Sequence, residues 1–115
     1  MDTVNKTMNI VNEPEVYRCV TVNTNHMKYK DAEILLYLSD GTDGIECSWH
    51  WIHQTSDGFL IRLTMRPNPV AWLKAQKLSD DFCDILTFLT EKSRASMVHF
   101  DQNGAVINGF PVHDF

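Results

Sequence analysis

The sequence predicts an α+β domain in which a mainly antiparallel sheet carries its helices on one face. Stretches rich in β-branched and aromatic residues alternate with stretches of helical periodicity, in the order β-α-β-β-α-α-β-β. The strands outnumber the helices and occur as hairpins, which favours antiparallel pairing. A chain of 115 residues, 43% of them hydrophobic and 22% charged, is long enough to bury one core.

The chain divides into a flexible N-terminal arm, residues 1–14, and a single domain, residues 15–115. The arm is polar, rich in asparagine and aperiodic, and it ends at a proline. The run 16–22 is rich in valine and predicts the first strand. Apolar residues at i, i+3 and i+4 then predict a helix over 28–39, which the glycine-containing stretch 40–44 ends.

Residues 45–54 and 59–65 predict a β-hairpin around an Asp-Gly turn. Strict alternation along the first of these strands would place Trp49 and Trp51 on the same face. The simpler interpretation is that both tryptophans fill the core beneath the helices, because each can bury about 150–250 Å². The functional interpretation is an exposed aromatic surface that anchors a partner, since tryptophan and arginine are enriched in binding hot spots.

The second half of the chain predicts two helices and a closing hairpin. Residues 70–77 form a short helix after a proline, and a second helix begins at Ser79, which is suited to cap it. Its apolar stripe at i, i+3, i+4 and i+7 consists of Phe82, Ile85, Leu86 and Leu89. Residues 97–100 and 105–107 flank an Asn-Gly pair that suits a tight turn, so they predict the last two strands.

The net charge of −5 is concentrated in the first half of the chain. Residues 1–57 carry nine acids and four bases, whereas residues 58–115 carry six of each and are neutral. Non-specific binding to nucleic acid needs clustered cations, so this balance argues against it. No apolar run approaches the roughly 20 residues of a membrane span, and the start lacks the features of a secretory signal. A cytoplasmic protein is therefore expected.

The cysteines and histidines give no metal-binding or catalytic pattern. The odd count of three cysteines, without tight spacing, predicts reduced thiols packed as small hydrophobes. His50 and His53 would fall on opposite faces of a strand, where they cannot share an ion. No nucleophile motif or glycine-rich phosphate loop is present. We therefore expect no metal, no cofactor and no catalytic residue; an enzyme would draw its base from His26, His50, His53 or His99.

A stretch without acidic residues supports an alternative function, nucleic-acid binding. It contains Arg62, Arg66, Lys74 and Lys77, and Trp72 lies in the same stretch, where it could stack on a base. Four cations spread over two elements are more often a solvated face.

Three segments of the chain form a recognisable pattern: RCVTVNTNHMKYKDAEILL, the GFLIRL end of the central hairpin, and the C-terminal MVHFDQNGAVINGFPVHDF. Together they resemble an uncharacterised family of small proteins carried by bacterial plasmids, prophages and genomic islands. In that family the first strand commonly ends in a Ser-Thr-Ala-His-like turn, of which Thr24 and His26 are present here. The resemblance implies no established activity, and His26, Arg62, His99 and Asp101 are the polar positions to inspect first.

The leading hypothesis is a non-enzymatic accessory or regulatory factor of a bacterial mobile element, which binds another protein and masks part of its surface. Small size, the lack of a catalytic motif and the acidity of the first half support it, since acidity would steer a basic partner. A homodimer formed through a sheet edge is left open. The alternatives are the nucleic-acid-binding module and a small hydrolase-like enzyme with a histidine base. The residues expected to bind are Trp49, Trp51, Arg62, Arg66, Trp72, His26, His99 and Asp101.

Overall fold

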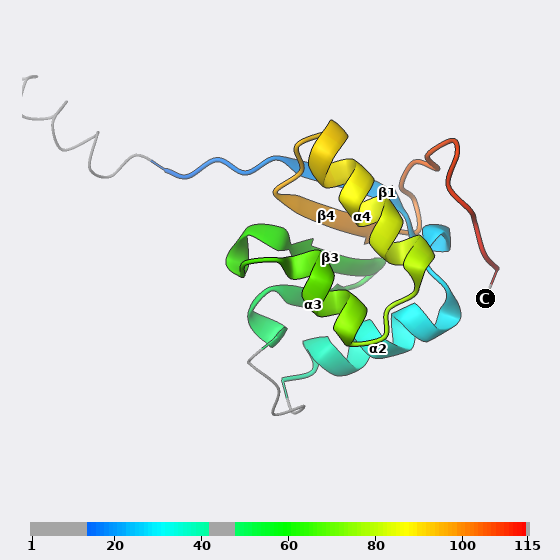
Figure 1. The fold of residues 1–115 in the computed structure, drawn as a ribbon, viewed down its shortest axis with the longest axis horizontal. Helices are drawn as coiled ribbons and strands as arrows, with labels where there is room; N and C mark the ends of the chain where they lie inside the picture. Colours follow the sequence, from blue (N-terminus) through cyan, green and yellow to red (C-terminus); the bar gives the residue numbers. More distant parts are fainter. Residues whose placement is uncertain (1–13, 42–47, 115) are drawn as a thin grey trace, which may run out of the picture.

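A computed structural model of the chain describes residues 14–41 and 48–114; the predicted N-terminal arm, apart from its last residue, lies outside these ranges. Four strands form one sheet in the spatial order β1-β4-β3-β2: β1 (Cys19–Asn23), β2 (Ile52–Thr55), β3 (Gly58–Arg62) and β4 (Met97–Asp101). β1 and β4 run parallel, whereas β4 with β3 and β3 with β2 are antiparallel (Figure 1). The predicted α+β class with a mainly antiparallel sheet is confirmed.

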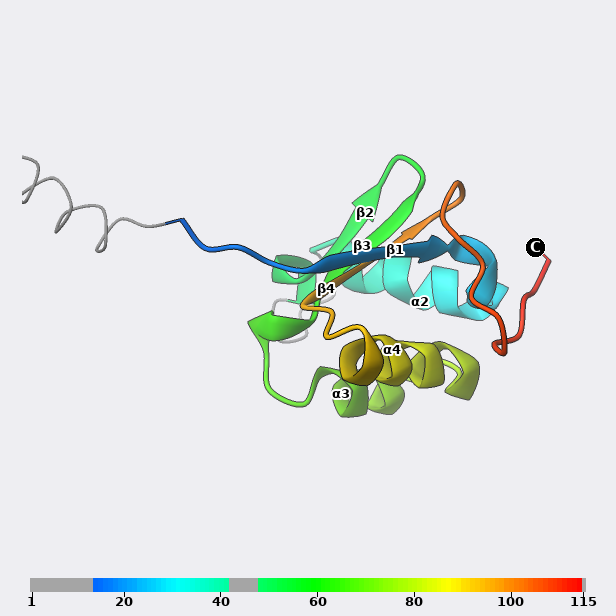
Figure 2. The same cartoon turned by 90° about the horizontal axis from the view of Figure 1, so that it is seen from above.

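Three helices cover one face of this sheet. They are α2 (Tyr29–Ser39), α3 (Pro69–Ala75) and α4 (Asp80–Lys92), with short 3-10 turns at Thr24–His26, Ser48–His50 and Leu63–Met65. Figure 2 shows α3 and α4 stacked together on the side of the sheet where α2 also lies. No helix within the described ranges is long and apolar enough to cross a bilayer.

The core lies between the helices and the covered face of the sheet. Val22, Phe100 and Phe59 are neighbours across β1, β4 and β3, and all three side chains are buried. From the helix side, Phe82 of α4 stacks on Phe100 with 5.0 Å between ring centroids. Phe82 also begins the buried stripe at i, i+3, i+4 and i+7 that the sequence predicts for this helix.

Local sequence signals place most element boundaries. The Asp-Gly hairpin is confirmed, since Thr55 of β2 pairs with Gly58 of β3. Ser79 caps α4 as predicted, and its Oγ accepts a hydrogen bond from the N–H of Phe82 at 3.2 Å. α2 and α3 begin within one residue of their predicted starts. The first strand is shorter than predicted, because β1 begins only at Cys19.

The predicted closing hairpin is wrong, because β4 has no free edge. β4 lies between β1 and β3 and pairs with both, so residues 105–107 cannot return alongside it. After the turn the chain crosses to the outer edge of β1, where Ala105 forms a parallel bridge with Val22. Gly104 permits this crossing, since a Cβ there would lie 2.5 Å from the carbonyl oxygen of Val22.

The predicted alternation around the tryptophans is also wrong. Trp49 lies in a 3-10 turn, β2 begins only at Ile52, and residues 42–47 lie outside the described ranges. Trp51 and Ile52 are adjacent and both buried, with 3% and 0% exposure, whereas Trp49 is 45% exposed. The two tryptophans therefore have different environments, because the backbone turns between them instead of running straight.

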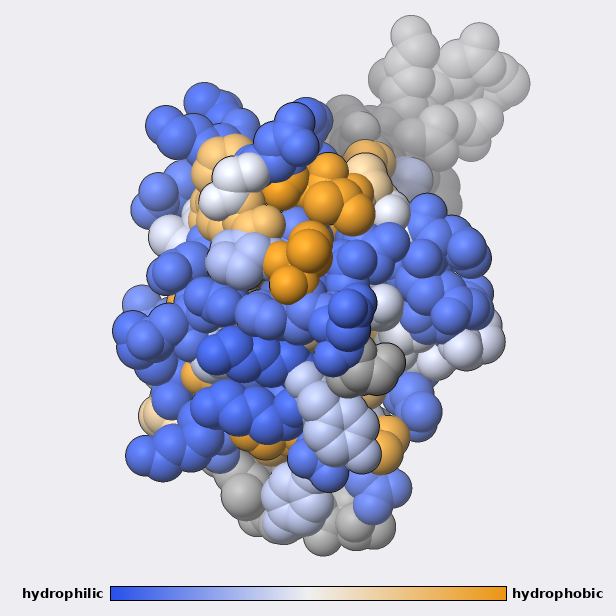
Figure 3. All heavy atoms as spheres, turned by 90° about the vertical axis from the view of Figure 1, so that its right-hand side faces the viewer, coloured by the Kyte–Doolittle hydropathy of each residue, from blue (hydrophilic) through white to orange (hydrophobic). Residues whose placement is uncertain are grey.

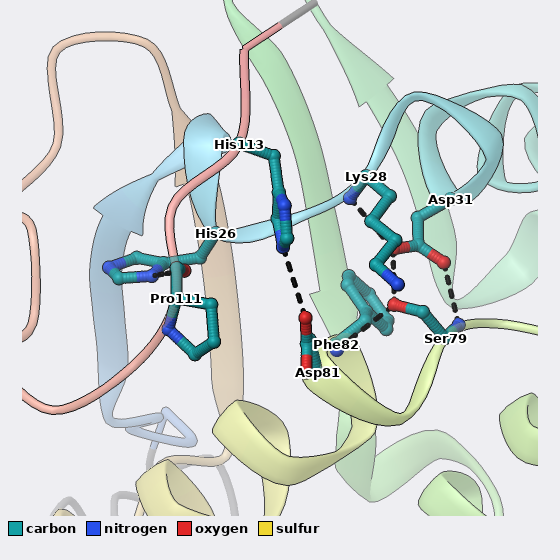
Figure 4. Close-up of polar contacts among 8 residues, drawn as sticks. All are labelled: His26, Lys28, Asp31, Ser79, Asp81, Phe82, Pro111 and His113. Carbon is teal, nitrogen blue, oxygen red and sulfur yellow. Dashed lines mark hydrogen bonds and ion pairs between the residues drawn. The ribbon is translucent and has the colours of Figure 1, made fainter.

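A buried carboxylate joins α2 to α4 (Figure 4). Oδ1 of Asp31 accepts the N–H of Ser79 at 2.7 Å, and Oδ2 accepts the Ser79 hydroxyl at 2.6 Å and the N–H of Lys28 at 2.8 Å. These bonds satisfy a charge that is fully buried, which would otherwise be costly. They also fix the start of α2 against the start of α4.

Candidate functional site

The eight residues expected to bind a partner do not form a single site. The structure brings Trp51, Arg66 and Trp72 into contact and, separately, His99 and Asp101, which share one face of the sheet with Arg62. Trp49 and His26 lie apart from both groups.

His26 is part of the interior, with 1% of its surface exposed. Its Nδ1 lies 3.0 Å from the carbonyl oxygen of Pro111, and its Nε2 accepts the N–H of Ile107 at 2.9 Å. This pattern assigns the neutral ring with the proton on Nδ1, because Nε2 must accept and the carbonyl can only accept. Both ring nitrogens of His26 are thus used within the chain, in a structural role, and Figure 4 shows the contact with Pro111.

His26 holds down the C-terminal segment, defined as residues 105–114. The same segment is bound at Asn25, whose carbonyl accepts the N–H of His113 at 2.7 Å, and at Asp81, whose Oδ2 lies 3.1 Å from Nε2 of His113. Figure 3 looks at the end of the molecule where this segment runs and shows a largely hydrophilic face with one hydrophobic patch. Within the segment, the side chains of Val106 and Val112 are exposed.

Trp51, Arg66 and Trp72 form a tryptophan–arginine cluster. The two indole rings meet edge-on with 5.4 Å between centroids. The guanidinium carbon of Arg66 lies 4.7 Å from the Trp72 centroid and 6.0 Å from the Trp51 centroid, which is cation–π geometry. Because Trp51 is almost wholly buried, the cluster fastens the turn after β3 to α3 and offers little free aromatic surface.

Arg62, His99 and Asp101 lie on the uncovered face of the sheet. Residues i and i+2 of a strand share a face, so His99 and Asp101 both point away from the helices. Nε2 of His99 lies 3.7 Å from Oδ2 of Asp101 and 3.5 Å from Oγ1 of Thr55 on β2. The imidazole can reach across β3 because the intervening residue, Gly58, has no side chain.

These contacts do not form a catalytic relay. A histidine base meets its nucleophile through one ring nitrogen and its acid through the other, whereas His99 faces Thr55 and Asp101 with the same nitrogen. On the same face, burial, followed by the positive charge of Arg62, lowers the pKa of His53. Within residues 14–41 and 48–114 no three potential metal ligands come together.

The cysteines differ from the prediction of three packed thiols. Cys83 is buried, as expected, and burial raises the pKa of its thiol. Cys19 is exposed at the start of β1, so that part of the prediction is wrong, and partial burial of its sulfur raises its pKa. Cys47 lies outside the described ranges.

The four predicted cations of the second half separate in space. Arg62 lies on the uncovered sheet face and Arg66 packs on Trp72, while Lys74 and Lys77 line a hollow with Lys28 and Lys30 at the starts of α2 and α4. This lysine hollow is defined by Lys28, Lys30, Lys74, Lys77, Leu78, Ser79, Asp80 and Asp81. It was not predicted, because its lysines come from two parts of the sequence that only the fold brings together.

A second surface missed at the sequence level is the α2 ridge, defined as Tyr29, Leu36, Tyr37 and Trp49. Their exposures are 60%, 47%, 53% and 45%. At about 100° per residue, the three helical members fall within an arc of roughly 100° on the face opposite buried Leu35. The aromatic spacing is the available signal, but the i, i+3, i+4 pattern of Ala32, Leu35 and Leu36 predicts that Leu36 faces the core together with Leu35.

Trp49 extends the ridge beyond the C-terminal end of α2. A Cβ added to Gly41, which follows the helix, would lie 3.6 Å from Cδ1 of the indole. His50 packs edge-on against the same ring with 3.9 Å between centroids. Beside the ridge, an open hollow of about 490 Å³ is lined by Glu33, Leu36, Tyr37 and Asp40.

Comparison with known proteins shows one family. Residues 19–115 match the family described as "Family of unknown function (DUF5983) C-terminal domain". The chain belongs to the DUF5983 family. The DUF5983 match begins at the first residue of β1 and so spans the whole sheet, the three helices and the C-terminal segment. The predicted resemblance to an uncharacterised family is confirmed. No curated protein and no solved structure matches the chain.

Proposed function

We propose that this DUF5983 protein is a non-enzymatic accessory or regulatory factor that binds a larger protein through the α2 ridge and masks part of its surface. The partner would present a basic surface with an apolar centre. The resemblance of the sequence to proteins of plasmids, prophages and genomic islands supports a role with a bacterial mobile element, in the cytoplasm.

The exposure of the α2 ridge is the observation that carries this proposal. Within the described ranges, four of the nine exposed large hydrophobic side chains belong to this one helix and the turn beside its end. Scattered exposed apolar residues are ordinary, but a gathered set marks an interaction surface. Tyrosine and tryptophan also supply much of the energy at protein interfaces, because they bury a large area with few rotatable bonds.

The charges around the ridge indicate the kind of partner. Glu33 and Asp40 lie on the same arc of α2 as Tyr29 and Leu36, and both line the hollow beside the ridge. Carboxylates at the rim of an apolar surface mainly raise the rate of association with a partner of opposite charge. The net charge of −5 in residues 1–57 also raises the rate of association with a positively charged partner.

The alternative functions have less support. Nucleic-acid binding through Arg62, Arg66, Lys74 and Lys77 needs a continuous basic stripe, and these residues lie in three separate places. Hydrolysis needs a base and an acid on opposite ring nitrogens, which His99 does not provide. Pairing of two copies along β2, which ends the sheet, stays a prediction.

The test uses the tagged full-length chain in a lysate of its native host, followed by binding measurements with the purified partner. The variant Leu36→Ser/Tyr37→Ser removes the centre of the α2 ridge. We expect its Kd for the partner to rise about 30-fold, because loss of a hot spot costs about 2 kcal/mol. Val106→Ser/Val112→Ser, which alters two side chains that are 52% exposed on the C-terminal segment, is the matched control and should bind as wild type does.

Two results would contradict the proposal. One is a wild-type chain that retains no protein above background. The other is a partner that binds the ridge variant as tightly as the control variant, when circular dichroism shows both to be folded. A third variant, Glu33→Gln/Asp40→Asn, should lower the association rate at low salt and leave it unchanged at high salt, since exposed charges are screened there.

A further inference from the structure

The lysine hollow gathers an unusual share of the positive charge of this acidic chain. Four of the ten lysine and arginine residues line one hollow of about 450 Å³, in a chain whose net charge is −5. The four come from the start of α2 and from the end of α3 and the turn after it, next to the start of α4. Their convergence is therefore a product of the tertiary fold.

The backbone around the hollow is held in place by buried bonds. Lys28 precedes α2, and its N–H donates to Asp31, which also binds both the N–H and the hydroxyl of Ser79. Lys77 has a φ of 77°, so the chain turns sharply after α3 and leads into buried Leu78. Figure 4 shows the side chain of Lys28 directed toward Ser79 and the start of α4.

The two carboxylates of the hollow already have partners. Nζ of Lys74 lies 3.4 Å from Oδ1 of Asp80, and Oδ2 of Asp81 lies 3.1 Å from Nε2 of His113. Within the described ranges, Lys74 is the one lysine of the hollow that forms an ion pair. Four lysines and two aspartates line the hollow, so its lining has an excess of two positive charges, which a ligand with two negative charges would neutralise.

The lining indicates what such a ligand looks like. The volume falls within the range of about 300–1,000 Å³ that is usual for small-molecule sites. Leu78 is the single apolar residue of the lining, and none of the eight lining residues is aromatic, so nothing there would stack on a base or bury a hydrophobic group. Lysines bind phosphate as point charges, without the planar geometry that arginine imposes.

We propose that the lysine hollow binds a diphosphate group, either as inorganic pyrophosphate or as the diphosphate of a nucleotide. Contact is confined to the phosphates, so pyrophosphate and ADP bind with similar affinity and a single phosphate binds more weakly. The lysines of the hollow that α2 supplies lie at its start, next to Tyr29, whereas Leu36 and Tyr37, the ridge residues that the binding test replaces, lie in its last turns. The two proposals can therefore fail separately.

Calorimetric titration of the full chain with pyrophosphate, ADP and phosphate tests the proposal. Lys30→Gln/Lys77→Gln should weaken pyrophosphate binding at least tenfold, because it removes two of the converging charges. Asp80→Asn should strengthen it about threefold, since it releases Lys74 and removes a repelling carboxylate. Lys92→Gln/Arg94→Gln removes the same charge at the other end of α4 and should leave the affinity unchanged.

The proposal is overturned if titration of the wild-type chain with pyrophosphate gives no saturable heat signal. It is also overturned if Lys30→Gln/Lys77→Gln and Lys92→Gln/Arg94→Gln lose the same amount of affinity for pyrophosphate. If ADP binds at least tenfold more tightly than pyrophosphate, the claim that the hollow contacts only the phosphates is wrong. Amide chemical shifts supply a measurement that needs no variant. Pyrophosphate should shift the signals of Leu78 and Ser79 before those of the uncovered sheet face, and the reverse order contradicts the site.

Discussion

At the scale of single residues, the fold depends on polar side chains that the core has enclosed. Asp31 is the clearest case, because its carboxylate accepts three hydrogen bonds, two from backbone N–H groups and one from a hydroxyl. Its partner Ser79 lies 48 residues away in the sequence, so no local pattern could reveal the pair. His26 is similar, since both of its ring partners come from the C-terminal segment.

We expect Asp31→Asn to lower the free energy of unfolding by about 2–3 kcal/mol. All three groups that contact Asp31 are donors, so an amide NH₂ in place of one oxygen would face another donor. Urea denaturation followed by tryptophan fluorescence measures the change. Asp84→Asn, at an exposed position of α4, should stay within about 0.5 kcal/mol of wild type. Equal stability of the two variants would show that the buried bonds contribute little.

The cysteines should differ in reactivity, because only a thiolate reacts quickly with an alkylating agent. Cys83 is 3% exposed, and burial raises the pKa of its thiol, so it is shielded in two ways. We expect iodoacetamide to label exposed Cys19 at least tenfold faster than Cys83 in the native protein. Peptide mapping by mass spectrometry gives the labelling rates of both cysteines. As a control, the two cysteines should be labelled at similar rates when the protein is unfolded in urea. Comparable labelling of the native chain would contradict the packing of α4.

At the scale of elements, sequence and structure agree where the signal is local. The cap at Ser79 and the Asp-Gly hairpin depend on neighbours in the chain, and both were predicted. The pairing of β1 with β4 joins Cys19 to Met97 and left no trace in the sequence pattern. The lysine hollow could not be predicted for the same reason, because distant segments bring its charges together. The α2 ridge had a local signal in its aromatic spacing, but which side of α2 is buried is set by distant segments.

The C-terminal segment acts as a stabilising element even though it contains no regular strand. It satisfies both nitrogens of His26, and Phe110 packs against Phe88 of α4 with 4.9 Å between ring centroids. A chain that ends at Gly104 should therefore lose about 2–4 kcal/mol of unfolding free energy. Thermal denaturation tests this, with His113→Ala as the control. That variant loses only a partly exposed contact and should change stability by less than about 1 kcal/mol. A truncated chain as stable as the control would contradict the role of the segment.

At the scale of the whole molecule, the two proposed surfaces divide the charge of the protein. The first half supplies the acids around the α2 ridge, and both halves contribute lysines to the hollow at the other end of the same helix. The molecule is thus polarised along α2, with carboxylates toward one end and ammonium groups toward the other. The net charge of −5 is a sum over the whole chain and does not show this arrangement. Composition therefore argues against nucleic-acid binding but gives no sign of a local basic site.

The central position of β4 also has a consequence for how the protein is made. Cys19 pairs with Met97, and 97 − 19 places these partners 78 positions apart in the growing chain. A ribosome that has reached residue 96 has produced every helix and three strands, but not the strand that joins β1 to β3. A polypeptide truncated at that point would leave β1 and β3 without the strand that joins them. The sheet against which α2 packs is therefore complete only once β4, near the other end of the domain, has been made.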